Sequence, residues 1–286
     1  MSNHRAAARR PVGMASARLS AGKLARIGWA VLAWLLLPCT AWAHAFWMVP
    51  FAPAVGLGDR VALDFRIGPG WPGESTPRLP GMVAEFQVID AQGSRVVDGR
   101  AGGTPGGHFQ ARSPGTSVAS MRTHPSTIVL LGAAFQDYLR EEGLDDALQY
   151  RAAMGIADLG ARENFSRAAK TLVFVQGQSA GFDRAAGLPF ELVPLTDPLA
   201  YSAGQPFRIK LIMKGKAAQG VRVTALHEGR SAPAMARTDA QGLATLELPS
   251  AGLWTFYAVH IEPAPRPPAD WESIWASLTF AIPGKR

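Results

Sequence analysis

Cysteine is almost missing from this sequence: the only one, Cys39, lies in an apolar stretch near the N-terminus. The chain beyond that stretch therefore has no thiol, which excludes disulfide bonds, thiolate metal ligands and cysteine nucleophiles. A G-x-S-x-G elbow, an H-E-x-x-H pair and a Walker loop are also missing. These absences remove the commonest routes to hydrolase and nucleotidase chemistry, and we expect a protein that is not an enzyme.

Acidic residues are missing from the first 43 residues, where six basic residues lie: Arg5, Arg9, Arg10, Arg18, Lys23 and Arg26. A mostly apolar run over 27–37 and the triplet Ala41-Trp42-Ala43 follow, as in a secretory signal. We therefore expect residues 1–43 to be a signal peptide that directs the protein to the periplasm. After its removal we expect the chain to contain no transmembrane segment. Cleavage after Ala43 would leave His44 at the N-terminus, whereas the alternative cut after Ala45 would discard it.

The positive charge of the chain belongs mostly to this first segment. The full sequence has 29 Lys and Arg against 22 Asp and Glu. Without the six N-terminal cations the balance is 23 against 22, a net charge near +1. The high isoelectric point is therefore no sign of nucleic-acid binding, and we expect none.

Long helical patterns are scarce, and short apolar stretches alternate with Gly- and Pro-containing turns, which predicts a mainly β fold. We expect two immunoglobulin-like or transthyretin-like β-sandwiches, over 44–131 and 187–286, bridged by a helical segment and a return strand over 132–186. Helical spacing predicts helices in 133–143 and 144–155, and 161–170 is interpreted as a third. The segments 68–81 and 101–115 are too rich in Gly and Pro for regular structure.

Several segments resemble the DUF4198 family, among them AHAFWMVP, YLREEGLDDALQYRAAMG, ARENFSRAAKTLVFV, TDAQGLATLEL and GLWTFYAVHIEP. The resemblance covers nearly all of the chain after the signal and is weakest over 90–125. It implies a periplasmic protein of a family often described as nickel or cobalt uptake components. A membrane transporter or receptor component would then be a partner. GKAAQGVRV and TDAQG also resemble transthyretin-like modules, which are mostly structural or binding domains.

A transition metal is the ligand that the remaining residues suit best. The amine and Nδ1 of an N-terminal His44 would chelate one ion, with geometry suited to Cu(II) or Ni(II). A further imidazole would come from His260, at the end of a predicted strand, or from His108, in a Gly-rich loop. Asp270 and Glu272 follow a Pro-rich loop and would ligate the ion or orient an imidazole. Each of these side chains also has an ordinary structural or solvated interpretation.

Two other histidines are interpreted as surface residues rather than ligands. His227 is expected to be a solvated residue at a hairpin tip, and His124, before a proline, is expected at the surface.

Three functions are consistent with these features. The first is a periplasmic protein that binds nickel, cobalt or copper, or assists its uptake. The second is a non-catalytic sandwich module that binds a partner protein or a glycan, for which Trp71 in a loop would be an exposed contact. The third is a copper oxidase of the histidine-brace type, which would use the same N-terminal histidine.

Overall fold

The computed structural model describes residues 45–284, so the predicted signal peptide and His44 lie outside the described residues. The described residues, 45–284, belong to one compact unit. No helix within the described range combines the length and the apolar character needed to cross a membrane.

The chain is mainly β, as predicted. The strands of its first half are β1 (Ala45–Pro50), β2 (Ala54–Val55), β3 (Arg60–Gly68), β4 (Glu74–Thr76), β5 (Val83–Asp90), β6 (Gly93–Val96), β7 (Gly107–Gln110), β8 (Gly115–Thr123) and β9 (Ser126–Leu130). The helices α2 (Gly132–Glu141) and α3 (Asp145–Ala153) follow, then β10 (Ala161–Val175). The second half contains β11 (Phe190–Pro194), β12 (Pro206–Met213), β13 (Lys216–Ala217), β14 (Arg222–His227), β15 (Arg230–Arg237), β16 (Leu243–Glu247), β17 (Gly252–Pro263) and β18 (Trp271–Ile282).

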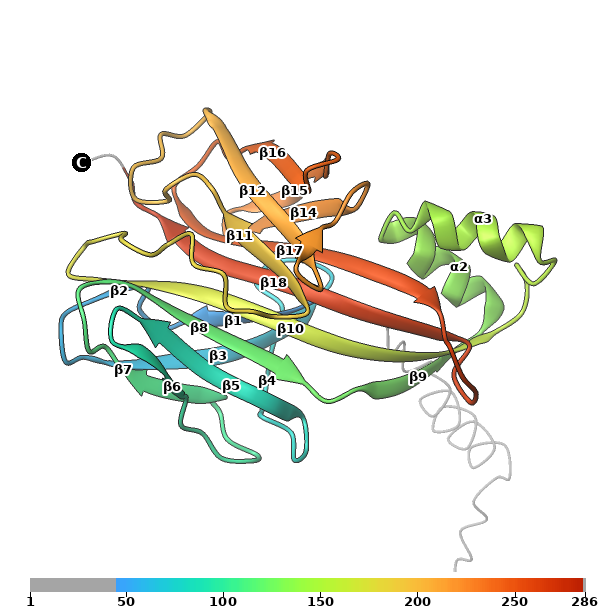
Figure 1. The fold of residues 1–286 in the computed structure, drawn as a ribbon, viewed down its shortest axis with the longest axis horizontal. Coiled ribbons are helices and arrows are strands. Elements are labelled where there is room, and N and C mark those ends of the chain that lie inside the picture. Colours follow the sequence, from blue (N-terminus) through green and yellow to red (C-terminus); the bar gives the residue numbers. More distant parts are fainter. Residues whose placement is uncertain (1–44, 285–286) are drawn as a thin grey trace, which may run out of the picture. The chain divides into compact units, whose positions relative to one another are not determined.

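A ten-stranded sheet runs through both halves in the order β15-β14-β17-β18-β10-β8-β5-β6, with β2 and β9 also paired to β10. The halves meet where β10 and β18 pair in parallel, from Glu163 opposite Trp271 to Thr171 opposite Thr279. Figure 1 shows these two long strands side by side. The boundary predicted near 186 falls between β10 and β11, but strands from both sides of it, such as β10 and β18, belong to the ten-stranded sheet.

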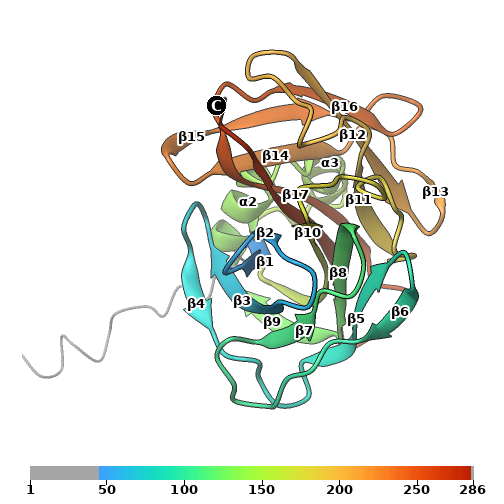
Figure 2. The same ribbon diagram turned by 90° about the vertical axis from the view of Figure 1, so that its left-hand side faces the viewer.

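The two faces of this sheet are covered by different smaller sheets. Alternate residues of a strand point to opposite faces, and β10 shows the division directly. Leu172 and Phe174 pack into a core with β11, β12 and β16, while Ala169 and Val173 pack into a core with β1, β3 and β7. Figure 2 shows the second half above the first around the shared strands. Each half is thus a two-layered sandwich, and one layer is common to both.

The two helices lie over the same face as the first small sheet. Phe135, Tyr138 and Leu139 of α2, at helical spacing, pack with Trp271 and Trp275 of β18. The Tyr138 and Trp275 rings stack with their centroids 6.0 Å apart. The spacing of apolar residues had predicted both helices, and the short connection at Gly143, whose φ is 63°, suits a glycine.

Three predictions about local structure were wrong. Residues 161–170 form most of β10 instead of a helix, because the alternating face of Ala168 and Lys170 is buried in the second sandwich. The two segments expected to be irregular contain short strands: β4 in 68–81 and β7 in 101–115. Both strands pair with β3, and this partner outweighs their Gly and Pro content.

Candidate metal-binding site

His260 and Glu272, two of the candidate ligands, line the same pocket, together with Glu262. His260 and Glu262 lie two residues apart on β17 and so share a face of the sheet. Glu272 of β18 is directly opposite Glu262 in the register, and His260 is opposite Ile274. The His260 Nε2 atom lies 3.6 Å from Glu262 Oε2.

The position of the pocket follows from where the covering sheet ends. Trp254, Phe256 and Ala258, the earlier residues on this face of β17, are buried in the core under β12. β11 begins at Phe190 and β12 ends at Met213, so His260 lies at the margin, with its ring centroid 6.4 Å from that of Phe190. Alternate residues of this strand are therefore buried as far as Ala258, and His260 marks the point where this face becomes open.

The pocket has a volume of about 160 Å³ and is also lined by Met213 and Lys214. The available donors are an imidazole nitrogen, two carboxylates and a thioether, a mixed set that suits borderline transition metals. Lys214 brings a positive charge that balances part of the negative charge and weakens the attraction for a cation. Two carboxylates directly across a strand pair repel each other, and a bound cation would relieve that repulsion.

The site is open rather than preassembled. Within residues 45–284, no three His, Cys, Asp or Glu side chains are gathered closely enough to hold a metal ion. The side chains of His260 and Glu262 are 39% and 52% exposed. They can therefore rotate toward an ion without disturbing the core, and a ligand from elsewhere would complete the coordination.

The other candidate ligands lie apart from this pocket. His108 is on β7 and lines a different cavity. Asp270 ties the turn before β18 to β10, because its Oδ2 accepts a hydrogen bond of 2.8 Å from the Arg162 amide. Its own amide donates to the Arg162 carbonyl at 2.8 Å. His44 lies outside the described residues, so its contribution stays a prediction.

Two interpretations of individual residues change with the structure. His227 is at a hairpin as predicted, but it is 6% exposed, so the prediction that it is solvated was wrong. Its ring lies 4.5 Å from that of Trp254, and its Nε2 is 2.8 Å from the Ala251 carbonyl. Trp71 is half-buried and stacks on Trp47, with ring centroids 6.3 Å apart, so it is not a free loop contact. His124 is at the surface, as predicted.

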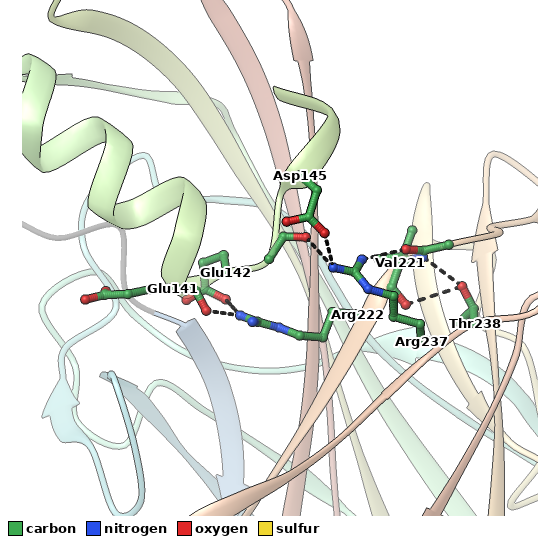
Figure 3. Close-up of polar contacts among 9 residues, drawn as sticks. Glu141, Glu142, Asp145, Val221, Arg222, Arg237 and Thr238 are labelled. Atoms are coloured by element: carbon green, nitrogen blue, oxygen red, sulfur yellow. Dashed lines mark hydrogen bonds and ion pairs between the residues drawn. The ribbon is translucent and has the colours of Figure 1, made fainter. Parts of the chain in front are cut away.

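A second pocket, of about 250 Å³, adjoins the site because His260 also lines it. Its wall is a set of charged contacts between the α2–α3 connection and the strands β14 and β15, which Figure 3 shows in close-up. Arg222 of β14 lies 3.6 Å from the Glu142 carboxylate and donates to the Glu141 carbonyl. Arg237 of β15 pairs with Asp145 and donates to the Gly143 carbonyl at 3.1 Å.

Burial controls the protonation of the acids on this side of the sheet. It raises the pKa of the Glu142 carboxyl to about 7, although Arg222 beside it opposes the rise. Burial also raises the pKa of Tyr257, with Glu142 adding to the effect. Glu163, on β10, is fully buried, and burial raises its pKa while hydrogen bonds from Ser273 and Tyr138 lower it. These groups hold the helices to the sheet, and the charge of Glu142 changes with pH near neutrality.

Glu262 is the ligand candidate that sequence reasoning missed. The sequence did carry a signal for it: Glu262 lies two residues after His260, and alternate residues of a strand share a face. Its meeting with Glu272 depends on the register of β17 and β18, which the Pro-rich connection between them does not specify.

The chain was compared with known families and structures. It matches the model of a domain of unknown function, DUF4198, over residues 41–262. No curated protein sequence matches it.

Similar solved structures include the tetra-tandem repeat in the extending region of a large adhesion protein, at 12% identity and a TM-score of 0.19. That match covers 83% of this chain and 49% of the other, so the chain spans about half of the repeat structure. A bacterial ice-binding adhesin of 1.5 MDa matches at 9% identity over 82% of this chain and 63% of its own, with a TM-score of 0.22. The D00-D0 domain of intimin matches at 11% identity over 84% of this chain and 100% of its own, with a TM-score of 0.18.

TM-scores this low do not establish a common fold. The family match, by contrast, runs from ahead of β1 into β17 and spans both sandwiches. It confirms what the sequence segments indicated: the chain belongs to the DUF4198 family.

Proposed function

We propose that this chain is a periplasmic protein that binds a transition metal, nickel, cobalt or copper, at the open ends of β17 and β18. The observation that carries the proposal is the pocket shared by His260, Glu262 and Glu272. Two of these residues were candidates from sequence before their neighbourhood was known. The proposed role is to capture the ion and pass it to a membrane transporter or receptor component.

The openness of the site supports transfer rather than permanent storage. Three donors at the margin of a sheet, with exposed side chains, leave coordination positions for a ligand from outside. His44, if it begins the processed chain, is one such ligand, and a partner's side chain is another. Among divalent ions, the nitrogen donor favours Cu(II) and Ni(II) over Co(II).

Equilibrium dialysis of the protein purified without its signal, against Ni(II), Co(II) and Cu(II) in turn, tests this proposal. We expect one ion retained per chain, and at least about tenfold weaker binding in His260→Ala and in the double variant Glu262→Gln/Glu272→Gln. His124→Ala is the matched control, because His124 is a surface histidine outside the pocket.

A chain that begins at Phe46 isolates the contribution of His44. If that chain retains metal and its His260→Ala variant does not, the ion is bound by the residues at the ends of β17 and β18 alone. No metal retained by any version, or equal binding by His260→Ala and His124→Ala, would refute the proposal and favour the interaction module. For such a module, exposed Leu131 and Leu159 at the end that bears the helices are the available apolar contacts.

A further inference from the structure

A larger hollow, of about 490 Å³, lies on the outer face of the first small sheet and shares no lining residue with the His260 pocket. Its floor is formed by β3 and β7, where Ala62 pairs with His108 and Arg60 with Gln110. The intervening residues Val61 and Phe109 are buried in the core. The alternation of the strands therefore directs Arg60, Ala62 and His108 outward, into the hollow.

The wall of the hollow is the loop 99–105, which is held in place by backbone hydrogen bonds. The Arg78 amide donates to the Gly103 carbonyl at 3.0 Å, and the Gly102 amide donates to the Arg78 carbonyl at 2.7 Å. Asp98 and His108 exchange two backbone hydrogen bonds at the loop base, of 3.0 and 2.7 Å. At Gly106 a Cβ would lie 2.6 Å from the Phe65 ring, so the loop lies against the core as only glycine permits.

The lining of the hollow is basic. It contains Arg60, Arg100 and His108 and no acidic residue. Outside the lining, Asp98 has a side chain that is 78% exposed, and its Oδ2 lies 3.9 Å from His108 Nε2.

The arginines here also differ from those with a structural role. Arg95, Arg222 and Arg237 each pair with a carboxylate. Within the described part of the chain, neither Arg60 nor Arg100 has a carboxylate within 4.0 Å. Their guanidinium groups are thus available for an anion from solution.

We propose that this hollow binds a small anion that bears two or more oxyanion groups, such as a polycarboxylate or a polyphosphate. Planar guanidinium groups form paired hydrogen bonds with carboxylate or phosphate oxygens. With one arginine on the floor and one on the wall, an anion with two separated groups engages both, and a single-charged ion engages one. The imidazole of His108 adds a further donor, and the absence of lining acids removes the main source of repulsion.

Isothermal titration calorimetry of the protein, with its signal removed and in metal-free buffer, tests the proposal with citrate and with pyrophosphate as probes. The ionic strength is fixed with chloride so that screening stays constant. We expect saturable binding of at least one probe, and at least about tenfold weaker binding in Arg60→Gln/Arg100→Gln. Preference for citrate would identify a carboxylate ligand, and preference for pyrophosphate a phosphate ligand.

Arg230→Gln/Arg266→Gln is the matched control, because it removes the same charge at two exposed positions outside the hollow. Binding in the control should stay within about twofold of the unaltered protein. The single variants Arg60→Gln and Arg100→Gln give a second measurement if the double variant does not fold. If both double variants bind the probe equally weakly, the effect comes from the net charge of the protein and the proposal is wrong. The absence of saturable binding of either probe would also overturn the proposal.

Discussion

Glu142 is a residue whose protonation depends directly on folding. Its carboxyl is buried at the end of α2, where Arg222 is its charged partner, and its pKa of about 7 compares with an ordinary value of 4.5. The folded chain therefore holds this proton to higher pH than the unfolded chain does. The resulting stabilisation is complete below pH 4.5 and is lost as the pH rises through about 7.

Glu142→Gln should remove this pH dependence, because glutamine resembles the protonated acid at every pH. Near pH 4.5 the variant and the unaltered protein should have similar free energies of unfolding. At pH 8 the variant should be more stable, by up to about 3 kcal/mol from the size of the pKa difference. Urea unfolding at several pH values measures this difference.

Glu141→Gln, a neighbouring carboxyl with no Arg222 side-chain pair, is the control for Glu142→Gln. A variant less stable than the unaltered protein at pH 8 would show that the ion pair with Arg222 outweighs the burial of the charge.

At the residue scale, sequence reasoning was reliable where the decisive neighbours are close in the chain. The surface position of His124 and the hairpin position of His227 follow from local pattern, and the structure agrees. His227 shows the limit. Its burial depends on Trp254, which is 27 positions away in the chain but directly opposite it in the register of β14 and β17.

At the scale of elements, β10 is held to the start of β11 by a buried ion pair. Lys170 Nζ lies 2.7 Å from Glu191 Oε1, and the two side chains are 1% and 2% exposed. Glu191 also accepts hydrogen bonds from the amides of Ala186, Gly187 and Leu188. Burial lowers the pKa of Lys170, and the charge of Glu191 opposes that change. One carboxylate thus fixes both a strand and the loop that leads into the second sandwich.

Glu191→Ala should destabilise the protein by about 3–5 kcal/mol, because it leaves a buried ammonium group without its partner. Denaturant unfolding measures the loss. Lys170→Met/Glu191→Gln is the informative comparison, since it removes both charges and keeps an oxygen for the loop amides. We expect the double variant to be more stable than Glu191→Ala. Equal losses of unfolding free energy in the two variants would contradict the energetic coupling between Lys170 and Glu191.

The same element shows why one helix prediction was wrong. ARENFSRAAK contains good helix-forming residues, and local propensity favours a helix there. The pairing with β18 and with β9 on either side outweighs it. In α2 and α3 propensity and surroundings agree, and those predictions were right.

At the scale of the molecule, the shared sheet predicts that both sandwiches unfold together. β18 completes the sheet of the second half and is also the parallel neighbour of β10 from the first half. Differential scanning calorimetry should therefore show one transition, with calorimetric and van't Hoff enthalpies in agreement. The separate fragments 45–186 and 187–284 should each lack cooperative unfolding. Two separated transitions in the whole chain, or a cooperative transition in either fragment, would contradict this prediction.

The mainly β class and the layered character of the fold could be predicted from sequence, because they depend on alternation and turn residues along the chain. The joining of the halves could not. Glu163 and Trp271 pair although they lie 108 positions apart in the chain, and no sequence feature near either residue indicates a parallel pairing. For the same reason His260 and Glu272 could be named as candidates, whereas the pocket that unites them with Glu262 had to be observed.

The pairing of β10 with β18 also has a consequence for a chain that is still being synthesised. On one side, the nine positions from Glu163 to Thr171 pair with Trp271 to Thr279, which are synthesised 108 positions later. Until then, one edge of β10 has no strand beside it, and an open edge is prone to pair with other chains. The sheet around β10 is thus incomplete until β18 has been synthesised.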